Sequence, residues 1–587
     1  MPQFDSLVDL FEKSCEKYAG NQLFGTKKDG QWDWITYGEF KSLVDRFRGG
    51  LAALGVGKGD RVGVVANNRV EWAVAAYATY GLAAQFVPMY EAQKESEWAF
   101  ILGDSEAKVV IGATNDIYAK LKGLVDQIDT LHHAVGLEAS PDDEGSYQAL
   151  LAKGEAEPVE ASHPSWDDLA GFIYTSGTTG KPKGVKLSHG NICSNVNAIH
   201  DVFTFTPDDR SLSFLPWAHS FGQTVELHGL LSMGSSLAIN DEIPSLVGNL
   251  AEVKPTILFA VPRIFNRIYD GVNKQMAERG GMVESLFHQA VGIAARKNAG
   301  EAIGFFEGLK LSLADSLIFS KVRARFGGRL KYAISGSAAL NRDVAKFIDA
   351  LGIEVYEGYG LTETSPIATA NYPGNRKIGS VGKAINQVRI VIDKKVTGDE
   401  ENGEIVIYGP NVMQGYHNRD DENAKVLMSD GGFRSGDMGR LDSEGYLYIT
   451  GRIKEQYKLE NGKYVVPSPL EEEIKLSPFV ANAMLYGMNK PYNVVLIVPD
   501  MVAFEPWCKE QGIDVASAPT NDKVLAMLQE EIQGNSKSFK RYELPKKVLV
   551  SLEEFTTDNN MLTPTLKLKR RNVLKQYGDA IEALYVG

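Results

Sequence analysis

The sequence predicts an α/β fold in which largely parallel sheets are layered with helices. The first observation is alternation: short runs with β-forming character, such as RVGVV (61–65) and QFVPM (85–89), enclose a stretch with helical character from about Val70 to Tyr80. Strands that alternate with helices in this way form parallel sheets covered by helices. The second observation is a change of texture from about residue 380, where short strands follow one another with glycine-rich turns. The chain is therefore expected to change architecture toward its C-terminal end.

The alternation continues through further predicted strands, which are KVVIGA (108–113), TILFAVP (256–262), LKYAISG (330–336) and IEVYEGYG (353–360). Residues 264–329 have a helical pattern, because apolar side chains recur there at i, i+3, i+4 and i+7. This pattern predicts a helical hairpin packed on the sheet, and one wall of a long apolar channel is compatible with that packing. The polar segment 139–168, interrupted by proline and glycine, predicts a surface connection.

Composition and charge exclude several classes of protein. The chain has 587 residues, of which 44% are apolar and 23% charged, as in ordinary globular proteins rather than disordered ones. Its 62 basic and 75 acidic residues give a net charge of -13. Nucleic-acid binding needs a concentrated positive field, so nucleic acid is not expected as the main partner. A local basic pocket for a small phosphorylated ligand remains compatible with this charge.

Cysteine usage and hydropathy predict a soluble protein of a reducing compartment, and a cytoplasmic location. The three cysteines, Cys15, Cys193 and Cys508, are odd in number and far apart, so they support neither a disulfide framework nor a zinc site. The N-terminus lacks the basic and apolar regions of a secretory signal. The longest apolar stretch, Trp72 to Ala84, has 13 residues, whereas about 20 are needed to span a bilayer. This stretch is expected to be a buried helix.

The first helix offers a weak sign of membrane contact. Its apolar side chains share one face, while acidic side chains make the other face negative; the apolar residues are Phe4, Leu7, Val8 and Phe11. We expect this helix to pack on its own protein rather than to anchor the chain, and contact with a membrane is expected only at the protein surface.

The strongest local motif is YTSGTTGKPKG, from Tyr174 to Gly184. Its three glycines allow the backbone to approach an anion closely, its hydroxyls offer donors, and its two lysines add positive charge, as a polyphosphate site requires. The motif is not the common P-loop, because Gly177 and Gly180 are separated by two residues and Pro182 follows Lys181. A kinase or P-loop ATPase is therefore disfavoured.

This motif resembles the phosphate-loop signature of the adenylate-forming enzymes, which include acyl- and aryl-CoA synthetases, firefly luciferase and nonribosomal peptide adenylation domains. Further motifs of that family match in the expected order along nearly the whole chain: LPWAHSF (215–221), ISGSAAL (334–340), GYGLTET (358–364), FRSGDMGRLDSEGYLYITGRIKE (433–455) and LTPTLKLKRR (562–571). The chain is most similar to bacterial long-chain fatty acyl-CoA synthetases.

The resemblance implies two domains and two half-reactions. Residues 1–451 would form a large adenylation domain for ATP and the acyl substrate, and residues 452–587 a small, mobile α+β domain that rotates about a hinge near Lys454. The carboxylate of the substrate would attack the α-phosphate of ATP, giving an acyl-adenylate and pyrophosphate. Coenzyme A would then take the acyl group and release AMP. Catalysis of the first step is mostly positioning and charge neutralisation.

The resemblance also assigns phosphate and metal ligands. The loop residues Thr175, Ser176, Gly177, Thr178, Thr179 and Gly180 would hold the β- and γ-phosphates, with Lys183 as the loop lysine. Thr178 and Glu363, beside Thr362, would fix a Mg²⁺ ion, which prefers hard oxygen ligands. From the residues alone, Glu363 could instead be a helix-capping carboxylate.

The nucleoside has its own expected ligands. Tyr359 would offer an aromatic face to the adenine, next to Gly360, and small residues would let the backbone reach its edge; these are Gly336, Ser337 and Ala338. Asp437 and Arg452 match the ribose ligands of the family. From the residues alone, Asp437 could equally be the side chain of an Asx-turn.

The C-terminal domain is expected to supply lysines to both half-reactions. Lys567 matches the lysine that neutralises the α-phosphate during adenylation, although Leu566 replaces the glycine that normally precedes it, and Lys569 is the alternative. Lys458 would face the active site in the thioester-forming state. Its partner Gly462 falls one residue later than in many relatives.

Two features bear on the carboxylate substrate. His219 aligns with a position that lines the acyl pocket, although it could simply be a satisfied core histidine. Gly360 stands where acetate-selective relatives carry a tryptophan, so its missing side chain is expected to open a channel for a long tail. Together with residues 264–329, these features predict a medium- to long-chain fatty acid. The alternatives are a fatty acyl-AMP ligase that delivers to a carrier protein, an aryl-CoA ligase, and a non-catalytic binding protein on the same scaffold.

Overall fold

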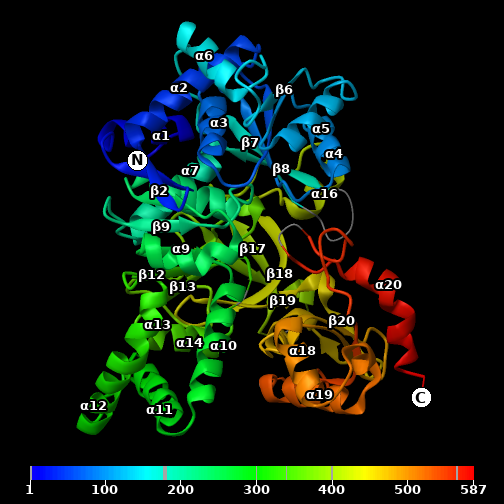
Figure 1. Cartoon of the computed structure of the whole chain (residues 1–587). Coiled ribbons are helices and arrows are strands. Elements are labelled where there is room, and N and C mark those ends of the chain that lie inside the picture. The colour runs from blue at the N-terminus through cyan, green and yellow to red at the C-terminus, as the bar shows by residue number, and fades with distance from the viewer. Residues whose placement is uncertain are drawn as a thin grey trace. The chain divides into compact units, whose positions relative to one another are not determined.

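The structure is a computed structural model that describes residues 3–175, 182–298, 300–338, 340–397, 401–537, 539–563 and 566–586 (Figure 1). Two compact units are present. The first contains the described chain up to Thr175, Pro182–Ile390 and Ile407–Arg434, and the second contains Val391–Val406 and the described chain from Ser435 onward. The functional division between residues 451 and 452 concerns a hinge and stays a prediction.

A six-stranded sheet with the order β6-β5-β3-β4-β7-β8 lies in the first unit. All neighbours pair in parallel except β8, which runs antiparallel to β7. Its strands are β3 (Arg61–Val65), β4 (Gln85–Met89), β5 (Val109–Gly112), β6 (His133–Gly136), β7 (Leu169–Thr175) and β8 (Lys183–Ser188). The helices that follow the first four strands are α3 (Val70–Tyr80), α4 (Glu95–Asp104), α5 (Asn115–Val125) and α6 (Tyr147–Ala156). The predicted strands 61–65 and 85–89 and the buried helix α3 are confirmed, and the run 108–113 contains a shorter strand.

A nine-stranded sheet, with the order β15-β14-β13-β12-β11-β9-β10-β1-β2, is the second sheet of this unit. Its strands are β1 (Gln22–Lys28), β2 (Gln31–Thr36), β9 (Arg210–Ser213), β10 (Ser236–Ile239), β11 (Ile257–Ala260), β12 (Tyr332–Ser335), β13 (Glu354–Tyr359), β14 (Thr369–Ala370) and β15 (Lys383–Ala384). From β1 to β13 in this order the strands are parallel, while β2, β14 and β15 are antiparallel additions at the edges. The predicted α/β class with mostly parallel sheets is confirmed.

Helices cover these sheets, and the first of them is buried. The remaining helices of this part are α1 (Leu7–Lys17), α2 (Tyr37–Ala53), α7 (His189–Val202), the π-helix η1 (Phe221–His228), α8 (Gly229–Ser232), η2 (Ile243–Ser245), α9 (Leu246–Val253), α14 (Arg342–Ala350), η4 (Thr362–Thr364) and α16 (Asp420–Val426). The apolar side chains of the first helix and of Phe4 are at most 4% exposed. The expectation that this helix packs on its own protein is confirmed.

Residues 262–325 form a helical extension, so the predicted helical character is confirmed, but the described residues form five helical segments rather than the single hairpin that was expected. The extension consists of α10 (Pro262–Arg279), α11 (Gly281–Asn298), α12 (Phe305–Ala314), the π-helix η3 (Asp315–Phe319) and α13 (Ser320–Arg325), drawn in green at the lower left of Figure 1. The extension packs on α14, where the ring of Phe347 lies 5.1 Å from that of Tyr269 and 6.0 Å from that of Phe287. In the part of the chain that the structure describes, no helix has both the length and the apolar character needed to cross a bilayer.

The remaining elements form three small sheets. A four-stranded sheet contains β16 (Arg389–Asp393), β17 (Gly403–Tyr408), β18 (Phe433–Leu441) and β19 (Leu447–Arg452), and a hairpin contains β20 (Tyr457–Lys458) and β21 (Tyr464–Val465). A three-stranded sheet contains β22 (Val480–Tyr486), β23 (Asn493–Pro499) and β24 (Pro545–Val550). The helices are α15 (Lys394–Thr397), η5 (Ile453–Glu455), α17 (Pro467–Ile474), α18 (Met501–Glu510), η6 (Val515–Thr520), α19 (Asp522–Asn535) and α20 (Arg570–Ala583).

The three-stranded sheet of the second unit is covered on both faces. Val495 and Ile497 of β23 point into a cluster with α17, α18 and α19, while Val494 and Leu496 point into a second cluster with α20. This is the period of two that a strand buried on both faces requires. The predicted α+β character of the C-terminal part is confirmed.

The close packing of α2 on α6 in the first unit can be tested by its effect on stability. A Cβ atom at Gly154 would lie 1.7 Å from the carbonyl oxygen of Arg46, so Gly154→Ala must push the helices apart. We expect this variant to lose about 3 kcal/mol of stability through overpacking. Gly123→Ala in α5 is the matched control, since its Cβ would meet nothing within 4 Å. The control should gain about 0.5–1 kcal/mol, and equal unfolding midpoints for the two variants in calorimetry would contradict this account.

Candidate active site

Three predicted site segments follow parallel strands of the nine-stranded sheet. His219 lies in the loop after β9, Gly336 follows β12 directly, and Tyr359 is the last residue of β13. Ser335, the last residue of β12, lies opposite Glu357 of β13, which continues for two more residues in the same direction. Ligands bind at the carboxyl ends of the strands in open α/β sheets. The structure therefore brings these segments to the edge of the sheet where a ligand is expected, with Ser337 and Ala338 exposed there.

Thr362 and Glu363 lie in η4, just beyond this edge. The hydroxyl of buried Thr362 is 3.2 Å from that of Ser220, which follows His219. The hydroxyl of Tyr416 donates a 2.7 Å hydrogen bond to the carboxylate of Glu363. Burial, and then the charge of Glu363, raise the pKa of Tyr416, so this hydroxyl stays a donor. The carboxylate of Glu363 is thus held by the side chain of Tyr416. Among the described residues it does not cap a helix.

Gly360 has a different role from the one expected of it. A Cβ atom at this position would lie 1.7 Å from the carbonyl oxygen of Pro366 and 2.9 Å from the hydroxyl oxygen of Thr364. The space beside Gly360 is filled by the backbone of the following loop. The prediction that its missing side chain opens an acyl channel is therefore wrong for this structure, where glycine permits a tight turn.

The ends of the phosphate-loop motif are fixed by a hairpin. Thr175 at the end of β7 lies directly opposite Lys183 at the start of β8. The predicted ligands between them, which are Ser176, Gly177, Thr178, Thr179 and Gly180, lie outside the described residues. The register alone places the hydroxyl-bearing Thr175 and the cationic Lys183 on adjacent strands.

Lys183 is neutralised by a residue that the sequence did not suggest. Its ammonium group forms an ion pair with the carboxylate of Glu422 in α16 and lies 5.0 Å from the centre of the Tyr416 ring. Lys183, followed by Lys425 at 2.6 Å, lowers the pKa of Glu422 to about 2. Both charges are about four-fifths buried, with side-chain exposures of 20% and 21%. The attraction between the two charges is therefore screened less by solvent than that of an exposed ion pair.

The segment from Met413 to Asn423 positions both Tyr416 and Glu422. Its backbone pairs with β8, since Lys186 donates to the carbonyl of Gly415 at 3.0 Å. The side-chain amide of Asn423 accepts from the backbone N–H of Tyr416 at 2.7 Å and donates to its carbonyl at 3.0 Å. Gly415 has a φ of +120°, and a Cβ there would lie 3.1 Å from the amide oxygen of Asn423. This clamp joins the start of α16 to the phosphate-loop hairpin.

The loop that carries His219 is held by Asn68. The amide of Asn68 donates to the carbonyl of Leu215 at 2.8 Å and accepts from the N–H of Trp217 at 2.8 Å. The N–H of Phe221 donates to Nδ1 of His219 at 3.2 Å, so in the neutral imidazole the proton is on Nε2. His219 is half-buried, at the edge of the core rather than within it.

A buried carboxyl group lies beneath this loop. Glu226 of η1 is fully buried and accepts hydrogen bonds from Ser211 at 2.5 Å and Ser213 at 2.7 Å. Burial raises the pKa of Glu226 to about 7. Ser213 also lies 3.1 Å from the amide nitrogen of Asn68, so this carboxyl belongs to the network that supports the His219 loop.

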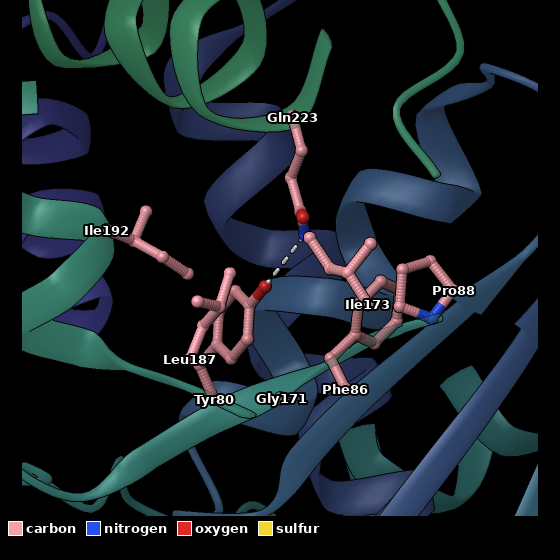
Figure 2. Close-up of a pocket in the computed structure, with 8 residues that line it drawn as sticks. All are labelled: Tyr80, Phe86, Pro88, Gly171, Ile173, Leu187, Ile192 and Gln223. Carbon is pink, nitrogen blue, oxygen red and sulfur yellow. Dashed lines mark hydrogen bonds between the residues drawn. The ribbon is translucent and has the colours of Figure 1, made fainter. Parts of the chain in front are cut away.

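A small cavity lies beside η1, where Gln223 donates to the hydroxyl of Tyr80 at 3.2 Å (Figure 2). Its other lining residues are Phe86, Pro88, Gly171, Ile173, Leu187 and Ile192. The amide oxygen of Gln223 is buried without a hydrogen-bond partner among the described residues. With a volume of about 10 Å³, the cavity fits one water molecule and not an acyl chain.

The second unit holds the predicted ribose ligands. Asp437 of β18 lies opposite Arg452 of β19, and the guanidinium nitrogen is 3.0 Å from the carboxylate oxygen. Asp437 is 5% exposed, whereas the side chain of Arg452 is 45% exposed. The alternative of an Asx-turn is not borne out, because Asp437 lies within a strand and faces a cation.

The predicted hinge and thioester-state residues lie in the following segment. Lys454 in η5 and Lys458 in β20 are both exposed. The ammonium group of Lys458 lies 5.2 Å from the centre of the Tyr464 ring on the paired strand. Gly462 has a φ of +85° and forms the hairpin turn between these strands.

The predicted adenylation lysine lies in a tight turn. The N–H of Lys567 donates to the hydroxyl of Thr563 at 3.0 Å, and the N–H of Thr563 donates to the carbonyl of Lys567 at 2.8 Å. Leu566 has a φ of +59°, which is the conformation that glycine adopts at least cost. The chain thus has the backbone of a glycine turn despite the substitution. Lys569, the alternative, instead precedes the first turn of α20.

No set of three or more histidine, cysteine, aspartate or glutamate side chains is grouped as a metal site among the described residues. The residues nevertheless fit Mg²⁺, which is commonly bound by one or two carboxylates, waters and substrate phosphates rather than by a protein cage. Glu363 supplies one half-buried carboxylate held in place by Tyr416.

Comparison with protein families identifies the scaffold. The model described as "AMP-binding enzyme" matches residues 11–417, and the model described as "AMP-binding enzyme C-terminal domain" matches residues 454–587. The chain belongs to the AMP-binding enzymes. The second match begins at the predicted hinge residue Lys454.

Two relatives of this AMP-binding enzyme match along nearly the full length. The long-chain-fatty-acid–CoA ligase FadD15 of Mycobacterium tuberculosis is 32% identical over 578 residues, covering 95% of this chain and 93% of the relative. The peroxisomal long chain acyl-CoA synthetase 7 of Arabidopsis thaliana is 30% identical over 615 residues, covering 100% of this chain and 87% of the relative.

Solved structures share the fold of this AMP-binding enzyme. The adenylation domain of a carboxylate reductase from Mycobacterium chelonae has a TM-score of 0.81 at 21% identity, covering 99% of this chain and 91% of that one. ATP-bound MatB from Rhodopseudomonas palustris has a TM-score of 0.73 at 24% identity, covering 98% and 99%. The predicted two-part fold is confirmed.

Leu566 allows the lysine turn of this AMP-binding enzyme to be tested. Leu566→Gly should relieve about 1 kcal/mol of backbone strain, which offsets the similar cost of glycine in the unfolded chain, so its unfolding midpoint should match or exceed that of wild type. Leu441→Gly is the control, because Leu441 is also partly exposed but ends an ordinary strand. The control should lose about 1 kcal/mol. Equal losses in calorimetry would show that the positive φ of Leu566 carries no strain.

Proposed function

We propose that this enzyme activates a medium- to long-chain fatty acid with ATP, giving an acyl-adenylate and pyrophosphate, and transfers the acyl group to coenzyme A with release of AMP. The proposal rests mainly on the full-length similarity to long-chain fatty acid–CoA ligases and acyl-CoA synthetases from bacteria and plants. The alternative of a carrier-dependent acyl-AMP ligase, and that of an aryl-CoA ligase, have no such support among these relatives.

In this reaction the first unit would bind the triphosphate and the adenine. Thr175 and Lys183 bracket the phosphate loop, and Lys183 would take up the charge of the β- and γ-phosphates. Tyr359, Gly360 and the segment from Gly336 to Ala338 would bind the adenine at the carboxyl edge of the sheet. The exposure of Ser337 and Ala338 and the half-buried position of Tyr359 support this assignment.

The metal would share the first unit with the phosphates. Glu363, with Thr178 of the loop, would hold Mg²⁺, and this ion would supply neutralisation of phosphate charge. Tyr416 would keep the carboxylate of Glu363 oriented, and Thr362 would fix η4 through Ser220. These contacts would hold the carboxylate of Glu363 in its orientation before the metal binds. The site then needs no rearrangement when charge develops during the reaction, which is the advantage of a preorganised electrostatic environment.

The second unit would complete both half-reactions. Asp437 would accept hydrogen bonds from the ribose hydroxyls. The guanidinium group of Arg452 would keep the carboxylate of Asp437 ionised and oriented. Lys567 would neutralise the α-phosphate as the carboxylate attacks it. Rotation at Lys454 would then present Lys458 for transfer of the acyl group to the thiol. His219, with a proton on Nε2, would orient the fatty acid carboxylate.

The cellular location of the enzyme is a separate part of the proposal. A cytoplasmic location stays a prediction, supported by three cysteines that are free and buried. Peripheral contact with a membrane also stays a prediction, although the first helix is not available for it.

The decisive test measures AMP and acyl-CoA formed from palmitate, octanoate and benzoate, with and without coenzyme A. We expect thioester from palmitate only when coenzyme A is present. Adenylate without thioester would indicate a carrier-dependent ligase, preference for benzoate an aryl-CoA ligase, and no product a binding protein.

The same assay distinguishes Lys567 from Lys569 as the lysine that acts in adenylation. Lys567→Ala should lower adenylate formation at least about 100-fold, because it removes a cation from the transition state, while Lys569→Ala should change it little. Conversion of supplied acyl-adenylate to thioester should survive in Lys567→Ala. Loss of adenylation in Lys569→Ala alone would reverse the assignment.

The ion pair of Lys183 leads to a separate prediction. Because β- and γ-phosphates must compete with the carboxylate of Glu422 for the same ammonium group, Glu422→Gln should lower the Kd for a non-hydrolysable ATP analogue about fivefold, the effect of about 1 kcal/mol. Binding of AMP, which lacks these phosphates, should not change. Asp421→Asn on the same helix is the matched control, since Asp421 pairs only with Lys425, at 3.5 Å, among the described residues. A similar gain in the control would reveal a general effect of net charge.

A further inference from the structure

The outer face of α12 is an apolar surface that the proposed reaction does not use. We define the α12 face by its exposed large apolar side chains, whose exposed fractions are Phe305 82%, Phe306 75%, Leu309 61%, Leu313 50% and, on η3, Leu317 48%. The opposite side of the same helical run is buried, with Ala314 at 0% and Phe319 at 1% exposure. The helix therefore has one side packed on its own protein and a second apolar side that faces solvent.

The α12 face is continuous along the helix. At about 100° per residue, the four side chains on α12 fall within an arc of about 100°, bordered by the exposed Lys310. Single exposed apolar residues need no explanation, but an adjoining set with a polar border marks an interaction site. Figure 1 shows α12 at the outer end of the helical extension, away from the sheets of its unit.

The segment that carries the α12 face is basic. Residues 281–329 contain seven basic and four acidic side chains, a net charge of +3, whereas the whole chain has -13. Three of the acidic groups are already paired: Glu301 and Glu307 with Arg296, and Asp315 with Arg323. The exposed basic side chains that have no ion pair among the described residues are Lys297, Lys310, Lys321, Arg325 and Arg329.

We infer that the α12 face docks on an anionic lipid surface, with the helix lying in the plane of the interface. An amphipathic helix binds there by inserting its apolar side chains among the lipids, and nearby lysines add attraction to acidic headgroups. A second copy of the chain is a poorer partner, because two such segments, each with a net charge of +3, would repel one another. The inference is independent of the proposed reaction, since lipid binding is measured without substrates.

The test is co-sedimentation of the full chain with vesicles of phosphatidylcholine alone and of equal parts phosphatidylcholine and phosphatidylglycerol. We expect binding to the anionic vesicles, weakened by salt. The double variant Leu309→Ser with Leu313→Ser should reduce the partition coefficient at least about tenfold. Val502→Ser with Met488→Ser is the control, because these side chains are 86% and 52% exposed in the second unit, and it should bind like wild type.

A second double variant controls for the possibility that the serine variant loses binding because it misfolds. Lys310→Glu with Lys321→Glu changes only exposed side chains and should abolish the preference for anionic vesicles while the unfolding midpoint stays the same. Absence of binding by wild type to both vesicle types would overturn the inference, as would undiminished binding by the serine double variant. If light scattering finds a wild-type dimer that the serine variant loses, the α12 face is an interface between copies, and the inference is wrong.

Discussion

The backbone pairing of β8 with residues 414–417 is the constraint on which the candidate active site of the first unit depends. Gln414 donates to the carbonyl of Lys186 at 3.0 Å, and His417 donates to the carbonyl of Gly184 at 2.8 Å. Because successive side chains of an extended chain point to opposite sides, this register determines the side on which Tyr416 lies. The ring of Tyr416 is thereby placed beside Lys183 and its hydroxyl beside Glu363. One backbone register thus connects the phosphate-loop hairpin with the predicted metal ligand.

A second constraint is the common end of the parallel strands. The strands β9, β12 and β13 deliver His219, Gly336 and Tyr359 to one edge, and the loops beyond that edge are held by buried polar groups rather than by apolar packing alone. Asn68, Glu226 and Thr364 each bind backbone or hydroxyl groups in or next to these loops. A buried polar group is costly unless it is bonded, so these networks permit few alternative loop conformations. The rigidity of the edge follows from this requirement.

The sequence predicted the local elements well and the long-range partners poorly. The strands 61–65 and 85–89 were predictable because a parallel strand buried on both faces appears as a short apolar run. Glu422 could not be found in this way, since 239 residues separate it from Lys183, and its acidic segment looks like an ordinary solvated helix start. The role of Gly360 was also misjudged, because a backbone approach from Pro366 leaves no trace in composition. Leu566 shows the reverse case, in which the backbone keeps a glycine-like turn although the residue has changed.

The acidic start of α16 has two opposing effects. Asp420, Asp421 and Glu422 lie in its first turn, where negative side chains stabilise the helix dipole of this seven-residue helix. The same charges would oppose the polyphosphate that the proposed function assigns to Lys183. Lys183 and Lys425 resolve this conflict by neutralising Glu422, which leaves the helix in place while cancelling much of the repulsion. In the proposed reaction the phosphates would take over Lys183, and Lys425 would remain as the partner of Glu422. The second lysine therefore allows the first to be released without leaving a buried carboxylate unpaired.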